Sequence, residues 1–511
     1  MKISPLLRTD SYKISHVHLM NQATKGGITR VQSNFTNRGS RVKGVEHVVL
    51  YGVQAWLKDV QESFGTMFFN RDVEEVIEEY REGIDGFVDL SVFDDTHIRK
   101  LHALGYLPIE VRALREGTLV PIRVPSLVIE NTHPDFPWLV NYLETWMSSA
   151  LWHPSTNATT AWFARRALNE YAQETTGQVD SCDFQFHDFS FRGLSNWQSA
   201  ATLGSAHLIS FRGSDNVPAK AFIKEYYPGE DNGFIAGSVV ATEHSIQVLN
   251  GRQGEFETYR RLIEGNPTGI LSLVSDTYDL FNVLTDFFPR LKEEILGRDG
   301  TVVVRPDSGK PADIICGTSE LVGIDSAWDT PEEKGVVQLL WDTFGGTVNE
   351  LGYKVLNPKV SVIYGDSINI QTAKNILERL KSKGFASTNV LFGWGSFLAT
   401  GALDKETLIT RDTYGSAVKS TWAEVDGVGV NLLKDPITDS GLKKSATGRL
   451  AVLPQMDGQL YLVEKATPEQ EAQSLLEPVW RDGEFIRTQS FNDVRETLKR
   501  WTGILERNGS I

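Results

Sequence analysis

The sequence predicts an α/β protein in which parallel strands, each followed by a helix, form a barrel-like series beside a second, β-rich domain. The first observation is a set of apolar strands that end at a carboxylate or a glycine: Ile270–Asp279, Thr301–Pro311, Val360–Ser367 and Val390–Ser396. The second is the helix-like stretches that follow such strands, at Leu280–Leu296, Ile368–Gly384 and Leu398–Leu408. The third is the short alternating strands at both ends of the chain. Repeated strand, turn and helix units place their functional ends on one face of an α/β fold.

We expect three segments within the 511 residues, a length that allows two or three domains. Residues 1–150 form the N-terminal part of the β-rich domain, and residues 151–405 form the α/β barrel domain that carries the active site. Residues 406–511 form the C-terminal part of the β-rich domain, so that the two ends of the chain pack together.

The composition limits the classes of partner. Lys and Arg number 51 against 66 Asp and Glu, and the net charge of −15 argues against a general nucleic-acid or anionic-membrane surface. Only two cysteines occur, Cys182 and Cys316, so no disulfide framework or cysteine-rich zinc site is expected. No signal peptide and no apolar run of membrane-spanning length is apparent. We therefore expect a soluble, cytoplasmic protein.

The first 150 residues show the β-rich texture. Gly27–Asn37 alternates as a half-buried strand does and ends in a basic turn that contains Arg38. Helices are predicted at Val48–Val60 and Val73–Gly83, and short strands follow from Leu107 to Glu130.

The middle of the chain begins with helices and continues with strand ends that resemble sites. Helices are predicted at Trp138–Trp152 and Ser155–Thr175, and strands at Phe184–Gly193, Ile209–Asn216 and Ser238–Ser245. In this region Phe189 is equally compatible with core packing, and His187 with a structural hydrogen bond. After Leu408 the short strands resume, and Phe491–Glu506 is predicted as a final helix.

The residues at the strand ends favour a phosphorylated substrate. Asp and Gly are common in any strand-to-helix turn, because Asp caps helices and Gly turns chains, but four such turns in series favour a site. No P-loop, Gly-x-Ser-x-Gly elbow or His-Glu-x-x-His helix is present. Carboxylates alone would suit a glycoside hydrolase, but guanidinium groups among them favour phosphate or carboxylate ligands. The alternating groups are the carboxylates Asp215, Asp276, Asp307 and Asp366 and the cations Arg192, Arg305, Arg411 and Lys419.

Eight segments together resemble the nicotinamide branch of the type II phosphoribosyltransferase and nicotinate phosphoribosyltransferase family. They are TDSYK, HDFSFRG, GSDN, ATEHS, SDTYD, RPDSG, YGDSIN and GVGVNLLKDP, in this order from about Leu6 to Phe491. The resemblance implies an irregular α/β barrel plus a β-rich domain, in a homodimer with active sites at the interface. It implies transfer of phosphoribosyl from phosphoribosyl pyrophosphate to nicotinamide, with Mg²⁺, and coupling to ATP hydrolysis through a phosphohistidine.

The same resemblance implies roles for residues of this chain. His244 matches the phosphorylated histidine, with Glu243 beside it and Asp276 as its orienting carboxylate. Nicotinamide would lie between Phe189 and Tyr12 of the partner subunit, near Arg192, with Asp215 accepting a hydrogen bond from the carboxamide. Further substrate positions are Ser238, Ser272, Arg305, Asp307, Gly365, Asp366, Gly395 and Ser396. Arg38, Arg411 and Lys419 match the contacts to pyrophosphate and ATP phosphates, and the metal is expected to be held mainly by substrate phosphates.

Some positions depart from the family pattern. The glycine-rich phosphate turn contains Trp394 and Phe397, and Ala417 replaces a serine that contacts phosphate. Val240 stands where a proline is usual, and the stretch Gly317–Lys354 is longer than in the animal enzymes.

Three alternatives stay open on the sequence alone. A nicotinate phosphoribosyltransferase has the same chemistry and a matching histidine, with Asp215 as the discriminating residue. A barrel glycosidase would use Asp276 and Asp307, and a non-catalytic binding protein would use the same scaffold without turnover.

Overall fold

The computed structural model describes residues 3–89, 94–318, 330–401, 407–438 and 444–510. They form two compact units. Unit 1 comprises Met1–Thr159, Phe222–Gly233 and Ile409–Ile511, and unit 2 comprises Thr160–Ala221 and Phe234–Leu408. The boundaries expected near residues 150 and 405 thus lie at 159 and 408, and residues 222–233, expected in the barrel domain, belong to unit 1.

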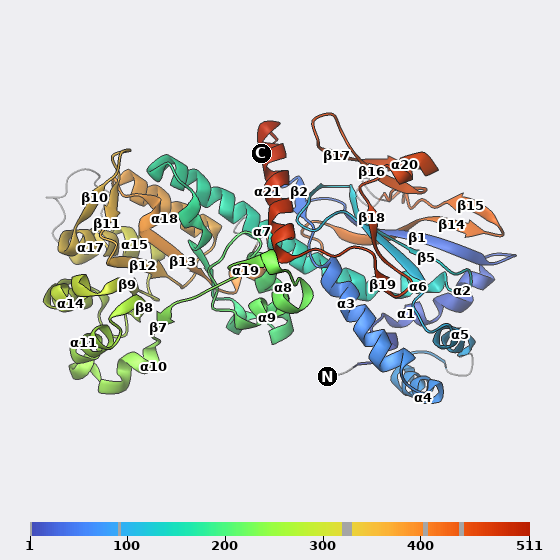
Figure 1. Ribbon diagram of the computed structural model, residues 1–511, viewed down its shortest axis with the longest axis horizontal. Coiled ribbons are helices and arrows are strands. Elements are labelled where there is room, and N and C mark those ends of the chain that lie inside the picture. The colour runs from blue at the N-terminus through green and yellow to red at the C-terminus, as the bar shows by residue number, and fades with distance from the viewer. Residues whose placement is uncertain (1–2, 90–93, 319–329, 402–406, 439–443, 511) are drawn as a thin grey trace. The chain divides into compact units, whose positions relative to one another are not determined.

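Unit 2 is built on a six-stranded sheet with the order β6-β13-β12-β9-β8-β7 (Figure 1). Every pair in it is parallel. The strands are β6 (Phe186–Asp188), β7 (Val240–Ala241), β8 (Thr268–Val274), β9 (Asp299–Arg305), β12 (Val360–Tyr364) and β13 (Val390–Trp394).

Isolated parallel bridges continue the pairing from β6 toward β7. Asp188 pairs with Ser214, and Gly213 pairs with Gly237, three residues before β7 begins. The sheet therefore curves back on itself as an irregular barrel, which confirms the predicted fold class. The strand predicted at Ile209–Asn216 is wrong in extent, because only residues 213 and 214 of it take part in this pairing.

Side chains along the barrel strands point alternately into the hydrophobic core of unit 2 and toward the inside of the barrel. Leu271 and Leu273 of β8 are buried in the hydrophobic core of unit 2, as are Val302 and Val304 of β9. The residues between them point the other way, as expected for a strand with a period of two residues.

Helices of unit 2 follow the strands. They include α8 (Trp197–His207), α10 (His244–Gln247), α11 (Glu255–Gly265), α14 (Lys292–Gly297), α15 (Pro311–Cys316), α17 (Val336–Phe344), α18 (Ile370–Ser382) and α19 (Phe397–Thr400). The helix predicted at Leu398–Leu408 is wrong in extent, because α19 ends at Thr400; residues 402–406 lie outside the described residues. The hairpin of β10 (Gly346–Val348) and β11 (Lys354–Leu356) and helix α17 occupy most of the described part of the long stretch Gly317–Lys354.

Unit 1 joins the two ends of the chain in one sheet, with the order β15-β14-β1-β5-β3-β18-β19. All of its pairs are antiparallel. The strands are β1 (Ile28–Asn37), β3 (Ile109–Ala113), β5 (Pro125–Asn131), β14 (Ser416–Val425), β15 (Val428–Asn431), β18 (Glu477–Arg481) and β19 (Glu484–Phe485). The expectation that the ends pack together is confirmed by the pairs β1–β14 and β3–β18.

Two small two-stranded antiparallel sheets and several helices complete unit 1. The sheets pair β2 (His47–Val49) with β4 (Leu119–Pro121), and β16 (Leu450–Pro454) with β17 (Leu460–Glu464). The helices are α1 (Ser11–Ile14), α2 (His16–Gln22), α3 (Val53–Phe64), α4 (Val73–Ile84), α5 (Thr96–Leu104), α6 (Trp138–Tyr142), α20 (Pro468–Ala472) and α21 (Phe491–Arg507).

Two predicted helices of this region differ from the observed ones. Val48–Val60 divides into strand β2 and helix α3, because the β-branched residues at 48 and 49 pair with β4. The helices expected at Trp138–Trp152 and Ser155–Thr175 are instead α6 and the 33-residue α7 (Glu144–Thr176), which continues through Pro154. Among the described residues, no helix combines the length and apolar character that crossing a membrane requires.

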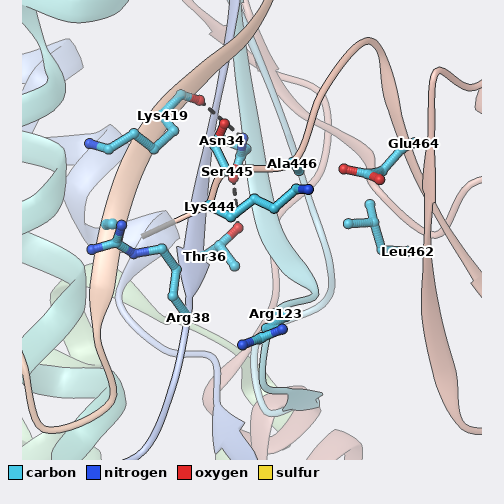
Figure 2. Close-up of a pocket in the computed structure, with 11 residues that line it drawn as sticks. Asn34, Thr36, Arg38, Arg123, Lys419, Lys444, Ser445, Ala446, Leu462 and Glu464 are labelled. Atoms are coloured by element: carbon cyan, nitrogen blue, oxygen red, sulfur yellow. Dashed lines mark hydrogen bonds between the residues drawn. The ribbon is translucent and has the colours of Figure 1, made fainter. Parts of the chain in front are cut away.

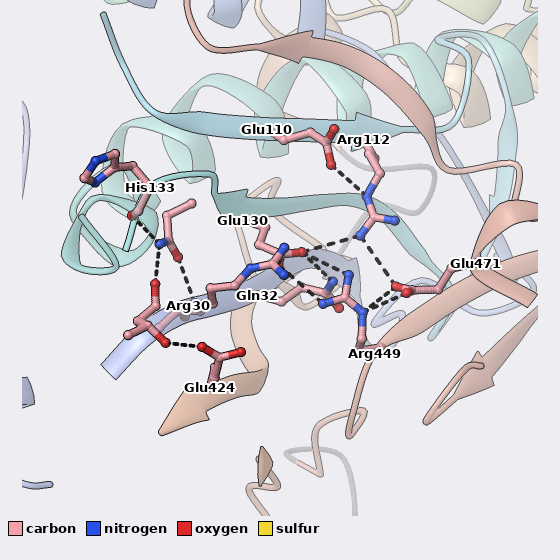
Figure 3. A network of polar contacts seen from close by, with 12 residues as sticks. Arg30, Gln32, Glu110, Arg112, Glu130, His133, Glu424, Arg449 and Glu471 are labelled. Atoms are coloured by element: carbon pink, nitrogen blue, oxygen red, sulfur yellow. Dashed lines mark hydrogen bonds and ion pairs between the residues drawn. The ribbon is translucent and has the colours of Figure 1, made fainter. Parts of the chain in front are cut away.

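A buried carboxylate stabilises the sheet of unit 1 (Figure 3). The side chain of Glu130 on β5 is 4% exposed and forms ion pairs with Arg30 and, at 3.1 Å, with Arg449. Arg449 also contacts Glu471 at 2.7 Å, and Arg112 lies 3.8 Å from Glu130. Three guanidinium groups therefore depend on one carboxylate for much of their charge compensation.

We predict that Glu130→Gln lowers the free energy of unfolding by about 3 kcal/mol or more, because removing one member of a buried ionic network leaves the others uncompensated. Urea unfolding measures the change. Glu110→Gln, at the more exposed rim of the same network, is the control and should change stability by less than about 1 kcal/mol. Equal effects of the two substitutions would contradict the account.

Candidate active site

The barrel of unit 2 contains a half-open cavity of about 640 Å³, within the usual range of roughly 300–1,000 Å³ for small-molecule sites. Its lining includes the strand residues that point away from the core, such as Ile270 and Ser272 of β8 and Val303 and Arg305 of β9. Of the residues expected to contact substrate, it brings together Phe189, Asp215, Ser238, Ser272 and Arg305.

Asp215 presents an ionised carboxylate to this cavity. Its Oδ1 accepts a hydrogen bond from the Ser238 hydroxyl and lies 3.0 Å from Nε2 of His187. Burial alone would raise the pKa of Asp215, but the hydrogen bonds from His187 and Ser238 and the charge of Arg305 outweigh it and lower the pKa. No hydrogen bond within the described chain ends on Oδ2, which leaves this oxygen available to a ligand.

Two glycines make room for the ring of Phe189. A Cβ atom at Gly393 would lie 2.2 Å from this ring, and one at Gly365 would lie 3.3 Å from it. The backbone N–H of Phe189 donates to the carbonyl of Trp394 at 3.0 Å. The bulk of Trp394 does not enter the cavity, because its side chain is buried in the core against Phe186.

The loops after β9 and β12 place cationic and anionic groups near each other. Nε of Arg305 is buried without a hydrogen-bond partner in the described chain, so this donor is unsatisfied. A Cβ atom at Gly365 would lie 3.2 Å from Oδ1 of Asp307, so this glycine also lets that carboxylate approach. Asp366 is exposed and accepts from Ser367, whose φ of 56° is unusual for a residue other than glycine.

His244 begins the short helix α10 and its side chain is 50% exposed. Its Nδ1 lies 3.0 Å from the Thr277 hydroxyl, and its Nε2 lies 3.9 Å from Oδ1 of Asp276. Asp276 is 6% exposed and accepts from the Asp307 backbone with Oδ2, while its Oδ1 is buried and accepts no hydrogen bond in the described chain. The carboxylate of Glu243 accepts from Ser245 instead of contacting the imidazole.

Sequence reasoning missed Thr277 as a partner of His244. The signal was present, since Thr277 directly follows Asp276 in the SDTYD segment. A threonine next to a candidate carboxylate has no distinctive spacing relative to a distant histidine, so the contact required the fold.

The remaining expected substrate residues lie outside this cavity lining. Arg192 is exposed on the turn Phe191–Gly193, and Ser396 and Gly395 follow β13. A Cβ atom at Gly193 would lie 2.6 Å from the Ser396 side chain, so these two segments are in contact. In unit 1, Tyr12 is 56% exposed on α1, beside Lys13, whose ammonium lies 2.5 Å from Glu144.

A second, smaller cavity of about 240 Å³ in unit 1 carries two of the three expected phosphate-binding cations (Figure 2). Arg38 and Lys419 line it, together with Ala417 and two cations that sequence reasoning did not select, Arg123 and Lys444. Burial lowers the pKa of Lys419, and the neighbouring Arg38 lowers it further against the opposing effect of Glu144. Arg411 is exposed, lies 3.7 Å from Asp412 and is not part of this lining.

No group of three or more His, Cys, Asp or Glu side chains among the described residues is arranged to hold a metal ion.

Comparison with protein families decides the assignment. Residues 184–484 match the model of the nicotinate phosphoribosyltransferase (NAPRTase) family. The chain is 42% identical over 510 residues to a nicotinamide phosphoribosyltransferase of Acinetobacter baylyi, with 97% of each chain covered. The chain belongs to the nicotinate phosphoribosyltransferase family. As a member of this family it is a pentosyltransferase.

One further relative supports the family, and two solved structures share the fold. A nicotinamide phosphoribosyltransferase of Xanthomonas campestris is 34% identical over 501 residues, covering 96% of this chain and 97% of the relative. Human nicotinic acid phosphoribosyltransferase has a similar fold, with a TM-score of 0.55 at 17% identity over 97% of this chain and 94% of that one. A nicotinate-nucleotide pyrophosphorylase of Pyrococcus furiosus gives a TM-score of 0.55 at 15% identity over 100% and 98%.

We predict that Gly393→Ala displaces the Phe189 ring and lowers the free energy of unfolding by about 1–3 kcal/mol, the usual cost of overpacking. A crystal structure and thermal unfolding measure both effects. Gly395→Ala is the matched control, because nothing lies within 4 Å of a Cβ atom at that glycine. An unmoved Phe189 ring in Gly393→Ala would show that the glycine is not required for its position.

Proposed function

We propose that this protein is a nicotinamide phosphoribosyltransferase of NAD salvage. The ring nitrogen of nicotinamide attacks C1 of phosphoribosyl pyrophosphate, the bond from C1 to the pyrophosphate oxygen breaks, and pyrophosphate leaves with the electron pair. The products are nicotinamide mononucleotide and pyrophosphate. Proteins of this family that are 34% and 42% identical carry the nicotinamide name, which supports the reaction.

The choice of base rests on one observation, the ionised carboxylate of Asp215 at the cavity wall. An ionised Asp is only an acceptor, and the carboxamide of nicotinamide carries two N–H donors. The carboxylate of nicotinic acid would meet Asp215 as a like charge. The lowered pKa of Asp215 keeps this discrimination in force at neutral pH.

The ring of the base is held by stacking in this proposal. Phe189 supplies one face from the cavity, with Arg192 nearby, and Tyr12 of the partner subunit supplies the other. The 56% exposure of Tyr12 supports a role at a surface between subunits. The functional enzyme is accordingly a homodimer with its active sites at the interface.

The phosphoribosyl group is held by the loops after the barrel strands. Arg305, with its unpartnered buried Nε, binds phosphate, and Asp307 binds ribose hydroxyls. Gly365 and Asp366 form the ribose-phosphate loop. Further contacts come from Ser238, Ser272, Gly395 and Ser396.

The phosphate chains of phosphoribosyl pyrophosphate and ATP are bound by Arg38, Arg411 and Lys419 of the partner subunit. Mg²⁺, held mainly by substrate phosphates, supplies charge neutralisation at the departing pyrophosphate. Fixed cations at that position favour the oxocarbenium-like transition state because they compensate the charge that develops on the leaving group.

His244 couples the reaction to ATP hydrolysis through a transient phosphohistidine. The half-exposed imidazole is accessible; the hydroxyl of Thr277 lies within hydrogen-bond distance of Nδ1, and the carboxylate of Asp276 lies farther off, 3.9 Å from Nε2. Glu243 lies next to it in the chain.

Both described cysteines are free and buried, which agrees with the proposed cytoplasmic location.

Replacing the selective carboxylate by an isosteric amide tests the choice of base. In Asp215→Asn we expect kcat/KM for nicotinamide to fall by about 10- to 100-fold, as for loss of a hydrogen bond to a charged group, while that for nicotinic acid holds or rises. Asp180→Asn, an exposed charge change outside the cavity, should leave both values unchanged. A native preference for nicotinic acid would overturn the choice of base and keep the family.

Coupling to ATP is tested at the histidine. In His244→Ala we expect product formation with ATP to fall to the unstimulated level, because no phosphoryl acceptor remains. Thr277→Val removes the hydroxyl at Nδ1 and should reduce stimulation by ATP while keeping some of it. Full stimulation by ATP in His244→Ala would exclude the phosphohistidine.

A further inference from the structure

The cavity of unit 1 contains cations that form no ion pair with a carboxylate in the described chain. Arg38, Arg123 and Lys419 line it, and within the described residues none of the three forms an ion pair. Lys444, also in the lining, differs because its ammonium lies 3.1 Å from Asp435. The one acidic residue of the lining, Glu464, accepts from the backbone of Thr447. The cavity therefore has an excess of positive charge that a bound anion would compensate.

Arg123 has an unusual backbone conformation for an arginine. It is the third residue of the turn Pro121–Val124, which is closed by a hydrogen bond of 3.1 Å from the N–H of Val124 to the carbonyl of Pro121. Its φ is 72°, in the left-handed region that glycine and asparagine adopt most readily at this position of a turn. Two other residues with such angles, Asp426 and Asp482, lie in hairpin turns directly before a glycine, where aspartate is common.

Strained residues outside ordinary turn chemistry are concentrated at functional sites, because only the surrounding structure and a function retain them. The N–H of Arg123 donates to the carbonyl of Asn37 at 2.7 Å, and Asn37 directly precedes Arg38. The strained turn is thus hydrogen-bonded to the segment that carries Arg38, another cation of the cavity. Figure 2 shows Arg123 at one end of the cavity, with Arg38 and Lys419 along its side.

We propose that Arg123 is a further binding residue for the phosphate chain of the substrates. The proposal rests on the proposed function, which assigns Arg38 and Lys419 to phosphate. A guanidinium group binds phosphate oxygens in a bidentate manner, so its chemistry matches this ligand. The volume of about 240 Å³ is below that of sites that enclose a whole drug-sized ligand, so the cavity suits a phosphate chain and not a complete nucleotide.

The backbone conformation gives the proposal a clear test, because Asn removes the charge and suits the left-handed turn. In Arg123→Asn we expect a melting temperature within about 2 °C of the native value or above it. We expect the Kd of Mg²⁺-pyrophosphate to rise about tenfold, as for loss of one charge-assisted contact. Isothermal titration calorimetry on the full-length protein measures the Kd of pyrophosphate, of phosphoribosyl pyrophosphate and of ATP in separate experiments. The ligand whose affinity falls in Arg123→Asn is the one whose phosphate chain Arg123 binds.

Two controls make the result specific. Arg500→Gln removes the same charge from the exposed face of α21 and should change none of the three affinities. Arg38→Ala and Lys419→Ala report on the proposed function itself. If these two weaken binding and Arg123→Asn does not, the role of Arg123 is overturned and the proposed function stands. If none of the three weakens binding, the assignment of this cavity to phosphate is wrong as well.

Discussion

Parallel pairing between the strands of unit 2 is the constraint on which the site depends. β8 and β9 pair in register from Thr268 with Asp299 to Val274 with Arg305, so the residues that follow both strands emerge side by side. This places the carboxylate of Asp276 within 2.9 Å of the Asp307 backbone N–H. A slip of one residue would turn Ser272 and Arg305 toward the core and the leucines of β8 into the cavity, so the register that builds the core also builds the site.

The charges of the protein fall into two classes that serve different purposes. In the network of Glu130, each charged group has a partner of opposite sign, and the network joins strands from distant parts of the chain. In the proposed sites, the reverse holds: Nε of Arg305 and Oδ1 of Asp276 are buried without hydrogen-bond partners, and Arg38 lacks an ion pair within the described residues. Unpaired buried polar groups reduce stability, and ligands that supply the missing partners recover it. This contrast distinguishes residues that maintain the fold from residues that we propose to bind substrate.

The sequence predicted the strand ends well, because a buried parallel strand is a continuous apolar run and its polar end is easy to locate. The barrel-like series, the joining of the chain ends and the strand-end positions of Asp215 and Arg305 follow from that pattern, whereas the place of Phe189 in the site was implied by the family resemblance. The positions where helices and strands begin and end were less predictable where tertiary contacts set them. At Val48, pairing with β4 overrides helix propensity, and at Pro154 the helix α7 continues through a proline. The roles that we propose for Thr277 and Arg123 could not be predicted from the sequence. They depend on the contact of Thr277 with His244 and on the backbone angle φ of Arg123, which have no sequence signature.

In this account nicotinamide is the base that accepts the phosphoribosyl group, and the charge of Asp215 selects it over nicotinic acid. The most direct measurement is product formation by the purified protein with phosphoribosyl pyrophosphate and Mg²⁺, with nicotinamide and nicotinic acid supplied in competition, with and without ATP. The account predicts that nicotinamide mononucleotide is the main product and that ATP increases its yield. Nicotinic acid mononucleotide as the main product would contradict the role of Asp215, and the absence of both mononucleotides would contradict the proposed reaction.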